Sequence, residues 1–196
     1  MSGPRIPMPS HLVVDPPARI PWLLRPMLWI AARMTGKDPL PGRLLAHYPK
    51  GAIGAGALEL AAAGAPGDLD GRSLATARIV ASAVAGCPFC VDMNAATWKR
   101  AGLSPAELNA LLRLEEGAWP TLGARENTAA RYARALSRTP VTVDEPLAAE
   151  LAAHFSPREI VVLAATIAQV NYWSRFNQGL GVPAAGFFDE TACPAP

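Results

Sequence analysis

The sequence has little charge, few cysteines and no long hydrophobic run. Charged residues make up 17% of the 196 residues, and the formal net charge is +2. Because there is no basic run, we expect neither nucleic acid nor an anionic membrane surface as a partner. No window reaches the roughly 18 uninterrupted apolar residues of a membrane span, since even residues 160–170 contain Thr166 and Gln169.

Residues 1–15 also lack the features of a secretory signal. Prolines and His11 interrupt the stretch in which such a signal needs an unbroken apolar core. We therefore expect a cytoplasmic protein. In that reducing compartment, a close pair of cysteines is more often catalytic, redox-active or metal-binding than a structural bridge.

Apolar residues, in contrast, make up 51% of the chain. A chain of this length buries about 70% of the surface that its unfolded form exposes, so one core needs no disulfide or metal to hold it together. From residue 44 onward the pattern is helical and rich in Ala and Leu, with almost no alternating β-branched runs. The sequence therefore predicts an all-α, single-domain helical bundle.

Proline and capping signals divide the chain into elements. Ten of the 20 prolines lie in the first 50 residues, which predicts a proline-rich N-terminal arm over 1–40, before a helical domain over 41–185 and a tail over 186–196. Capping boxes begin at Ser104 and Ser156, and Asp144 is a further N-cap. The expected helices are 22–34, 43–63, 72–86, 88–101, 105–116, 123–137, 145–154 and 157–178. Residues 74–85 and 160–173 are apolar nearly all the way round, which predicts that these two helices are central and buried.

The feature with chemical content is the sequence Cys87-Pro88-Phe89-Cys90. A proline in the first turn of a helix places Cys87 at or near the N-cap and Cys90 inside the first turn. Unpaired backbone N–H groups and the helix dipole stabilise a thiolate there, and residues three apart are close enough to form a disulfide. On the same face, Asn94 is the polar side chain best placed to touch the sulfurs, whereas Asp92 points elsewhere.

The residues alone leave three interpretations of this pair open. A zinc site needs four ligands, and only the remote Cys193 and the scattered His11, His47 and His154 are available, so we expect no metal. A thioredoxin-type motif needs a preceding strand, whereas residues 78–85 have a helical pattern. The third interpretation is two small buried residues one helical turn apart.

Two separated blocks of sequence supply the context that the motif lacks. ASAVAGCPFCVDMNAATWKRAG (81–102), and YARALSRTP with FSPREIVVLAATIAQVNYWSRFNQGLG within 131–181, resemble the carboxymuconolactone decarboxylase-like superfamily, which includes the alkylhydroperoxidase D-type enzymes. The likeness covers roughly residues 40–183. It implies an alkylhydroperoxidase D-like all-α fold, no cofactor, and homo-oligomers, trimers or larger, with a dimer as the smaller alternative. It also implies thiol-dependent reduction of hydroperoxides, with Cys90 as the peroxide-attacking thiol and Cys87 as the resolving one.

The chain departs from the family pattern at two proton-handling positions. The family has a Glu twelve residues before the first cysteine and a His four after the second, where this sequence has Ala75 and Asn94. Asn cannot act as a general base near pH 7, so the sequence predicts a slow peroxidase unless another carboxylate substitutes. Glu59 and Glu159 are the candidates. The simpler roles are a solvated helix residue for Glu59 and the capping-box partner of Ser156 for Glu159.

The sequence thus predicts a weak or specialised thiol peroxidase or disulfide reductase that acts on a small organic hydroperoxide and uses a thiol reductant. The alternative is a catalytically degenerate member that binds a ligand or serves assembly, with Phe89, Trp98, Tyr172 and Trp173 around an apolar pocket. Lactone decarboxylation is disfavoured, because the cysteines are kept while the base is lost. A pocket that reaches Cys90 beside a carboxylate or histidine favours the enzyme, and sealed sulfurs favour the alternative.

Overall fold

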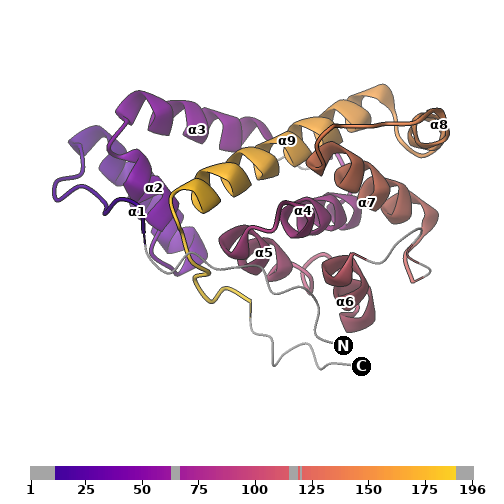
Figure 1. Cartoon of the computed structure of the whole chain (residues 1–196), viewed down its shortest axis with the longest axis horizontal. Helices are drawn as coiled ribbons and strands as arrows, with labels where there is room; N and C mark the ends of the chain where they lie inside the picture. The colour runs from indigo at the N-terminus through magenta and orange to yellow at the C-terminus, as the bar shows by residue number, and fades with distance from the viewer. Residues whose placement is uncertain (1–11, 63–66, 115–118, 120, 189–196) are drawn as a thin grey trace.

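The computed structural model describes residues 12–62, 67–114, 119 and 121–188, and within them the chain is helical with no strand (Figure 1). Three helices form the centre: α4 (Gly71–Ala85), α7 (Ala124–Ser137) and α9 (Pro157–Gly179), and α4 packs against both of the others. Ile79, Leu163 and Ile167 are fully buried between them. The all-α prediction and the burial of residues 74–85 are therefore confirmed. Residues 160–173 are central, but they are not buried all round, because Val161 and Tyr172 are 68% and 39% exposed.

Shorter helices surround this centre. They are α5 (Pro88–Ala95), α6 (Pro105–Arg113) and α8 (Glu145–His154). Both predicted capping boxes are present, because Ser104 and Ser156 accept the N–H of the third helical residue while Glu107 and Glu159 accept the N–H of the caps. Asp144 caps α8 as predicted, by accepting the N–H of Leu147 at 2.9 Å.

Several boundaries differ from the prediction, and local reasons account for three of the differences. The expected helix over 43–63 is two helices, α2 (Leu40–Leu45) and α3 (Pro49–Ala62), because a residue that precedes proline disfavours the helical conformation. The expected helix over 88–101 ends at Ala95, where the Thr97 hydroxyl donates to the Asn94 carbonyl oxygen at 2.8 Å and competes with helix continuation. Helix α6 ends at Arg113, before Leu114 in the left-handed region.

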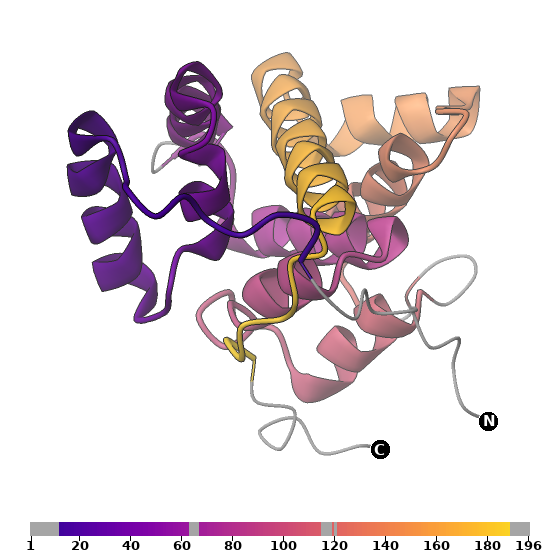
Figure 2. The ribbon, with the colours of Figure 1, turned by 60° about the vertical axis from the view of Figure 1, so that its left-hand side comes forward.

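The N-terminal part lies at one side of the molecule. A short 3-10 helix, η1 (Trp22–Leu24), leads into α1 (Arg25–Thr35), which has no buried residue and stands apart from the central helices in Figure 2. Residues 12–21 cross from α1 to the C-terminal end of α9, where the Val13 N–H donates to the Leu180 carbonyl oxygen at 3.0 Å. The N-terminal segment thus reaches the C-terminal end of α9, close to Cys87 and Cys90.

Among the described residues, no single helix is both long and apolar enough to cross a membrane, and the one pair that is apolar enough together, α8 with α9, is bent by 118°.

Candidate functional site

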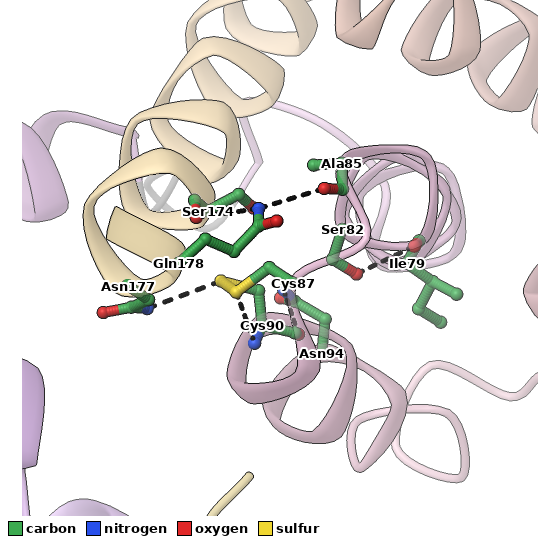
Figure 3. The surroundings of a disulfide bond; sticks show 9 residues. All are labelled: Ile79, Ser82, Ala85, Cys87, Cys90, Asn94, Ser174, Asn177 and Gln178. Carbon is green, nitrogen blue, oxygen red and sulfur yellow. Dashed lines mark hydrogen bonds between the residues drawn. A yellow bond between two sulfur atoms is a disulfide. The ribbon is translucent and has the colours of Figure 1, made fainter. Parts of the chain in front are cut away.

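The cysteine pair lies where α4 ends and α5 begins. Gly86 ends α4 in the left-handed region, at φ 67°, and the chain then turns into α5 with Cys87 as its N-cap (Figure 3). The Cys87 sulfur accepts the backbone N–H of Cys90 at 3.2 Å, and the two residues form a disulfide with their Cα atoms 5.2 Å apart. The predicted N-cap geometry is therefore confirmed, and the two cysteines are close enough to form a disulfide, as predicted.

Both sulfurs are closed off from solvent. Cys87 is 0% exposed and Cys90 is 1% exposed. Leu44 of α2, Val182 and Phe187 of the segment after α9, and Leu12 of the N-terminal segment pack around them in one apolar cluster. A small molecule can therefore reach the pair only when part of this cover moves.

The segment after α9 is tied to α5 by Asp92. Its carboxylate accepts the N–H of Ala185 at 2.8 Å and the N–H of Phe188 at 2.7 Å. Both bonds of this side chain thus go to the backbone of the segment after α9. These bonds hold residues 185–188 against α5, where Ala185 and Phe187 pack on the cysteine cluster.

Asn94 lies one turn after Cys90, but its amide bonds to other groups. Its Nδ2 donates to the Cys90 carbonyl oxygen at 2.8 Å, and its Oδ1 accepts from Arg78 Nε at 3.2 Å. The polar side chain that reaches sulfur is instead Asn177 of α9, whose Nδ2 donates to Cys90 Sγ at 3.5 Å (Figure 3). The expectation that Asn94 is the polar side chain best placed to touch the sulfurs is corrected, because its amide is held by the Cys90 carbonyl oxygen and by Arg78.

Helix α9 brings further amide and hydroxyl groups to the same end of the molecule. Gln178 Nε2 donates to the carbonyl oxygen of Ala85, the last residue of α4, at 3.0 Å (Figure 3). Ser174 and Asn177 are 0% and 1% exposed, and within the described part of the chain Ser174 Oγ and Asn177 Oδ1 have no hydrogen-bond partner. Buried polar atoms are costly when left unpaired, so this end of α9 retains capacity to bind a polar group.

Glu59 is not simply a solvated helix residue. Although it is 45% exposed, its carboxylate accepts from Trp173 Nε1 at 2.9 Å and from Gln169 Nε2, and it lies 3.8 Å from Arg78 Nη2. Burial lowers the pKa of the Arg78 guanidinium, and the Glu59 charge opposes that shift. Because Arg78 also bonds to Asn94, a polar chain runs from α3 through α4 to α5.

The other carboxylate candidate, Glu159, has the predicted structural role. It completes the Ser156 capping box and also pairs with Arg125 at the far end of α9. The Ser156 backbone N–H and then Arg125 lower the pKa of this carboxyl. Glu159 therefore belongs to the capping of α9 and not to the cysteine site.

The structure separates the four aromatic residues that were candidates for one pocket. Phe89 and Trp173 pack in the apolar cluster of the cysteines, whereas Trp98 is buried in the main core. Tyr172 is 39% exposed and lies edge-on to Trp173. The four residues therefore do not line a single pocket.

Metal ligation is not suggested by the described residues, where no three His, Cys, Asp or Glu side chains come together. His47 bonds through Nε2 to the Asp15 carbonyl oxygen at 2.8 Å, and His154 ends α8. Cys193 and His11 lie outside the described residues.

Two residues of the site, Arg78 and Asn177, were not singled out from the sequence. Arg78 had a signal, because it is the one charged residue in the apolar run 74–85, and a lone charge in a buried helix needs a partner. Asn177 had none, since its contact with Cys90 joins residues 87 positions apart. Ala75, at the position of the family's Glu, is buried on α4 three residues before Arg78.

Comparison with known proteins agrees with this architecture. The sequence model of the Carboxymuconolactone decarboxylase family matches residues 52–135, which include the cysteine pair. The uncharacterized protein YnjA of Escherichia coli (strain K12) is 34% identical over 177 residues, which are 88% of this chain and 94% of that protein.

Solved structures share the fold at lower identity. The alkylhydroperoxidase AhpD core structure of an uncharacterized peroxidase-related protein from Ralstonia eutropha JMP134 superposes with a TM-score of 0.71 at 21% identity, covering 93% of this chain and 95% of that one. The debrominase Bmp8, in its apo form, superposes with a TM-score of 0.73 at 20% identity, covering 90% of this chain and 94% of that one.

Proposed function

This chain belongs to the carboxymuconolactone decarboxylase family, and from that premise we propose that Cys87 and Cys90 reduce small organic hydroperoxides with electrons from an external dithiol. The observation that carries the proposal is the disulfide at the start of α5, with the Asn177 amide on Cys90 Sγ at 3.5 Å. An N–H donor and a helix N-terminus are the surroundings that stabilise a thiolate. The peroxidase-related proteins of the same fold support this class of chemistry.

The proposed reaction balances over the two cysteines. The Cys90 thiolate attacks the terminal oxygen of the hydroperoxide, an S–O bond forms, the O–O bond breaks, and the alkoxide leaves with a proton as an alcohol. Cys87 then attacks the sulfenic acid at sulfur, which forms the disulfide and releases water. An external dithiol returns two electrons and two protons to restore the pair.

Polar side chains of α9 can form hydrogen bonds with both the sulfur and the hydroperoxide in this reaction. Asn177 Nδ2 touches the sulfur that would carry negative charge in the reduced state. Ser174 Oγ and Asn177 Oδ1 are buried and unpaired among the described residues, so the hydroxyl can donate to a hydroperoxide oxygen and the amide oxygen can accept the hydroperoxide O–H. With Asn at position 94 and Ala at position 75, we expect slow turnover, because general acid–base help contributes about 10²- to 10⁴-fold.

One observation favours a second candidate function. The sulfurs are sealed, at 0% and 1% exposure, inside an apolar cluster. A catalytically degenerate member that binds a ligand or serves assembly would keep such a pair as a fixed staple across the first turn of α5. The two candidates differ in whether the reduced pair reacts with a hydroperoxide at all.

Trapping the first intermediate tests the assignment of the two thiols. In a Cys193→Ser background, we expect Cys87→Ser treated with cumene hydroperoxide to form one sulfenic acid, trapped by dimedone at Cys90 and located by mass spectrometry. The matched variant Cys90→Ser should show no adduct at Cys87. Adduct at Cys87 alone would reverse the two roles, and no adduct in either variant would favour the degenerate candidate.

We also propose, for the same protein, a cytoplasmic location and assembly with further copies of itself. The apolar side chains Trp22, Trp29 and Met34 of η1 and α1 are 78%, 64% and 82% exposed, and Leu60 of α3 is 85% exposed. Exposed apolar surface of this kind is typical of subunit contacts. Light scattering during gel filtration should give a mass of at least twice 20.6 kDa, and Trp29→Glu should lower it.

A further inference from the structure

We propose that Arg78, held between Glu59 and Asn94, is the fixed positive charge that stabilises the Cys90 thiolate. This inference rests on the proposed function in taking Cys90 as the attacking thiol. It assigns an electrostatic role to one partly buried arginine, in a chain that lacks a Glu at position 75 and a His at position 94.

The position of Arg78 is set by two partners on other helices. Its Nε donates to Asn94 Oδ1 at 3.2 Å, and its Nη2 lies 3.8 Å from Glu59 Oε1. Asn94 in turn donates to the Cys90 carbonyl oxygen at 2.8 Å. One side chain therefore joins the guanidinium to the residue that carries the reactive sulfur.

The surroundings keep that charge in place. The Arg78 side chain is only 19% exposed, whereas Glu59 is 45% exposed. A buried charge interacts more strongly with its neighbours than a solvated one, because water screens it less. The guanidinium is therefore screened less than the carboxylate that faces it, and its Nε is bonded to the Asn94 side chain of α5.

A fixed cation differs chemically from a histidine. Arginine stays protonated across the pH range in which a thiol titrates, whereas histidine changes charge near pH 6.5. The reactivity of Cys90 should therefore follow one ionisation, that of the thiol itself. Arg78 acts on the sulfur without touching it, so it is a positioning residue, and Asn177 is the side chain that touches the sulfur.

Other charged groups near the pair are engaged elsewhere or exposed. Asp92 accepts two backbone N–H groups from residues 185 and 188. His47, just after α2, is exposed and bonds to the Asp15 carbonyl oxygen. The remaining charged residues of α2, α4 and α9 do not contact the sulfurs. Four of them are in ion pairs with other residues: Arg43, Arg72, Arg158 and Glu159. The fifth, Arg175, is exposed to solvent.

The test measures thiolate formation without any hydroperoxide. In a reduced protein carrying Cys87→Ser and Cys193→Ser, the ultraviolet absorbance of the Cys90 thiolate is followed against pH. We expect Arg78→Met to move the midpoint upward by about one pH unit, which is a tenfold loss of thiolate at a fixed pH below the midpoint. Arg78→Lys keeps the charge and should stay within about half a unit of the parent.

Two further variants serve as controls, one for the case that Arg78→Met does not fold and one for the general effect of removing a positive charge. Asn94→Ala leaves Arg78 in the chain but removes its link to α5, and should raise the midpoint by less than Arg78→Met. Arg131→Met, which breaks a surface pair with Glu150, is the matched control and should leave the midpoint unchanged. If Arg78→Met does not fold, the Asn94→Ala and Arg78→Lys titrations decide the question.

The outcomes separate this inference from the proposed function. Equal midpoints in the parent, Arg78→Met and Asn94→Ala proteins would overturn it, as would a histidine-like inflection near pH 6.5 in the parent protein. A shifted midpoint in a protein that ignores hydroperoxides would sustain the thiolate role and overturn the peroxidase. An unshifted midpoint in a protein that consumes hydroperoxides would do the reverse.

Discussion

The two ends of the central helices are built from different chemistry. At the end where α4, α6, α7 and α9 begin, two arginines join four acidic residues. Arg72 bonds to Glu107 at 2.5 Å and to Glu126 at 2.9 Å, and Arg125 bonds to Asp70 at 2.8 Å and to Glu159. We call this group of six residues the capping network. Acidic groups near helix N-termini complement the helix dipole, so the network locks four helix starts together.

The opposite end, where α4 and α9 finish and α5 starts, has few charges. The cysteine pair there is surrounded by apolar side chains and by the amides of Asn177 and Gln178. One ion pair, Arg78 with Glu59, approaches from the side. The comparison teaches that most acidic groups near these helices stabilise the fold, whereas the polar groups described around the sulfurs are neutral amides and, through Asn94, the Arg78 guanidinium. Substitutions at the cysteine end should therefore lower activity, and substitutions in the capping network should lower stability.

The largest effect is expected from Cys90→Ser. We expect it to lower kcat/KM for cumene hydroperoxide by roughly a thousandfold or more, because it removes the nucleophile. Under reducing conditions its free energy of unfolding should stay within about 1 kcal/mol of the parent, because Ser is close to Cys in size. Peroxidase assays with dithiothreitol and urea denaturation measure the two quantities. A loss of stability without a loss of activity would contradict the division between the two ends.

Arg125→Met should produce the opposite result. Arg125 bonds to two carboxylates and to the His154 carbonyl oxygen, and it lies over the Phe155 ring at 4.2 Å. Its loss should cost about 2 kcal/mol of unfolding free energy, while the folded variant keeps the parent kcat/KM. The control, Arg43→Met, breaks an exposed pair with Asp38 and should cost less than about 0.5 kcal/mol. Equal losses in the two variants would count against a cooperative network.

Ser156→Ala tests one member of the capping set. It removes the oxygen that accepts the Glu159 N–H at 3.3 Å, and we expect a cost of about 1 kcal/mol with unchanged peroxidase activity. Ser156→Asp, which retains an acceptor at the N-cap, should recover most of that loss. Thermal unfolding provides the measurement, and a cap variant as stable as the parent would show that the network alone fixes the start of α9.

The smallest effect is the dependence of stability on pH. For Glu107, burial raises the pKa, but the Ser104 bonds and Arg72 together lower it below the usual 4.5. Because the folded pKa lies below the unfolded one, this carboxylate stabilises the protein above pH 4.5, and that contribution is lost as the pH falls through the folded pKa. Glu107→Gln should flatten the fall in unfolding free energy below pH 4.5. If the variant and the parent show the same dependence of unfolding free energy on pH, Glu107 does not contribute to that dependence.

Local signals predicted where helices begin at both ends of the molecule. The capping boxes at Ser104 and Ser156 and the position of Cys87 at an N-cap follow from residues within one helical turn, and the structure confirms all three. The split of residues 43–63 at Pro49 also had a local signal, which the prediction did not weigh.

The partners of the cysteine site had to come from the structure. Asn177 of α9 contacts Cys90, which lies 87 residues earlier in the chain. Glu59 of α3 pairs with Arg78, which lies 19 residues later. Helical periodicity places residues on a face of their own helix but not against another helix. Asn94 illustrates the limit, because its face was predicted correctly while its partner was the Cys90 carbonyl oxygen and not a sulfur.

The central claim is that the sealed pair is a working dithiol. One equivalent of cumene hydroperoxide is added to the reduced Cys193→Ser protein, and the remaining peroxide and free thiols are followed together. The account predicts that peroxide disappears with the loss of two thiols per chain and the appearance of the Cys87–Cys90 disulfide in mass spectrometry. Persistence of the peroxide while both cysteines stay free would contradict it.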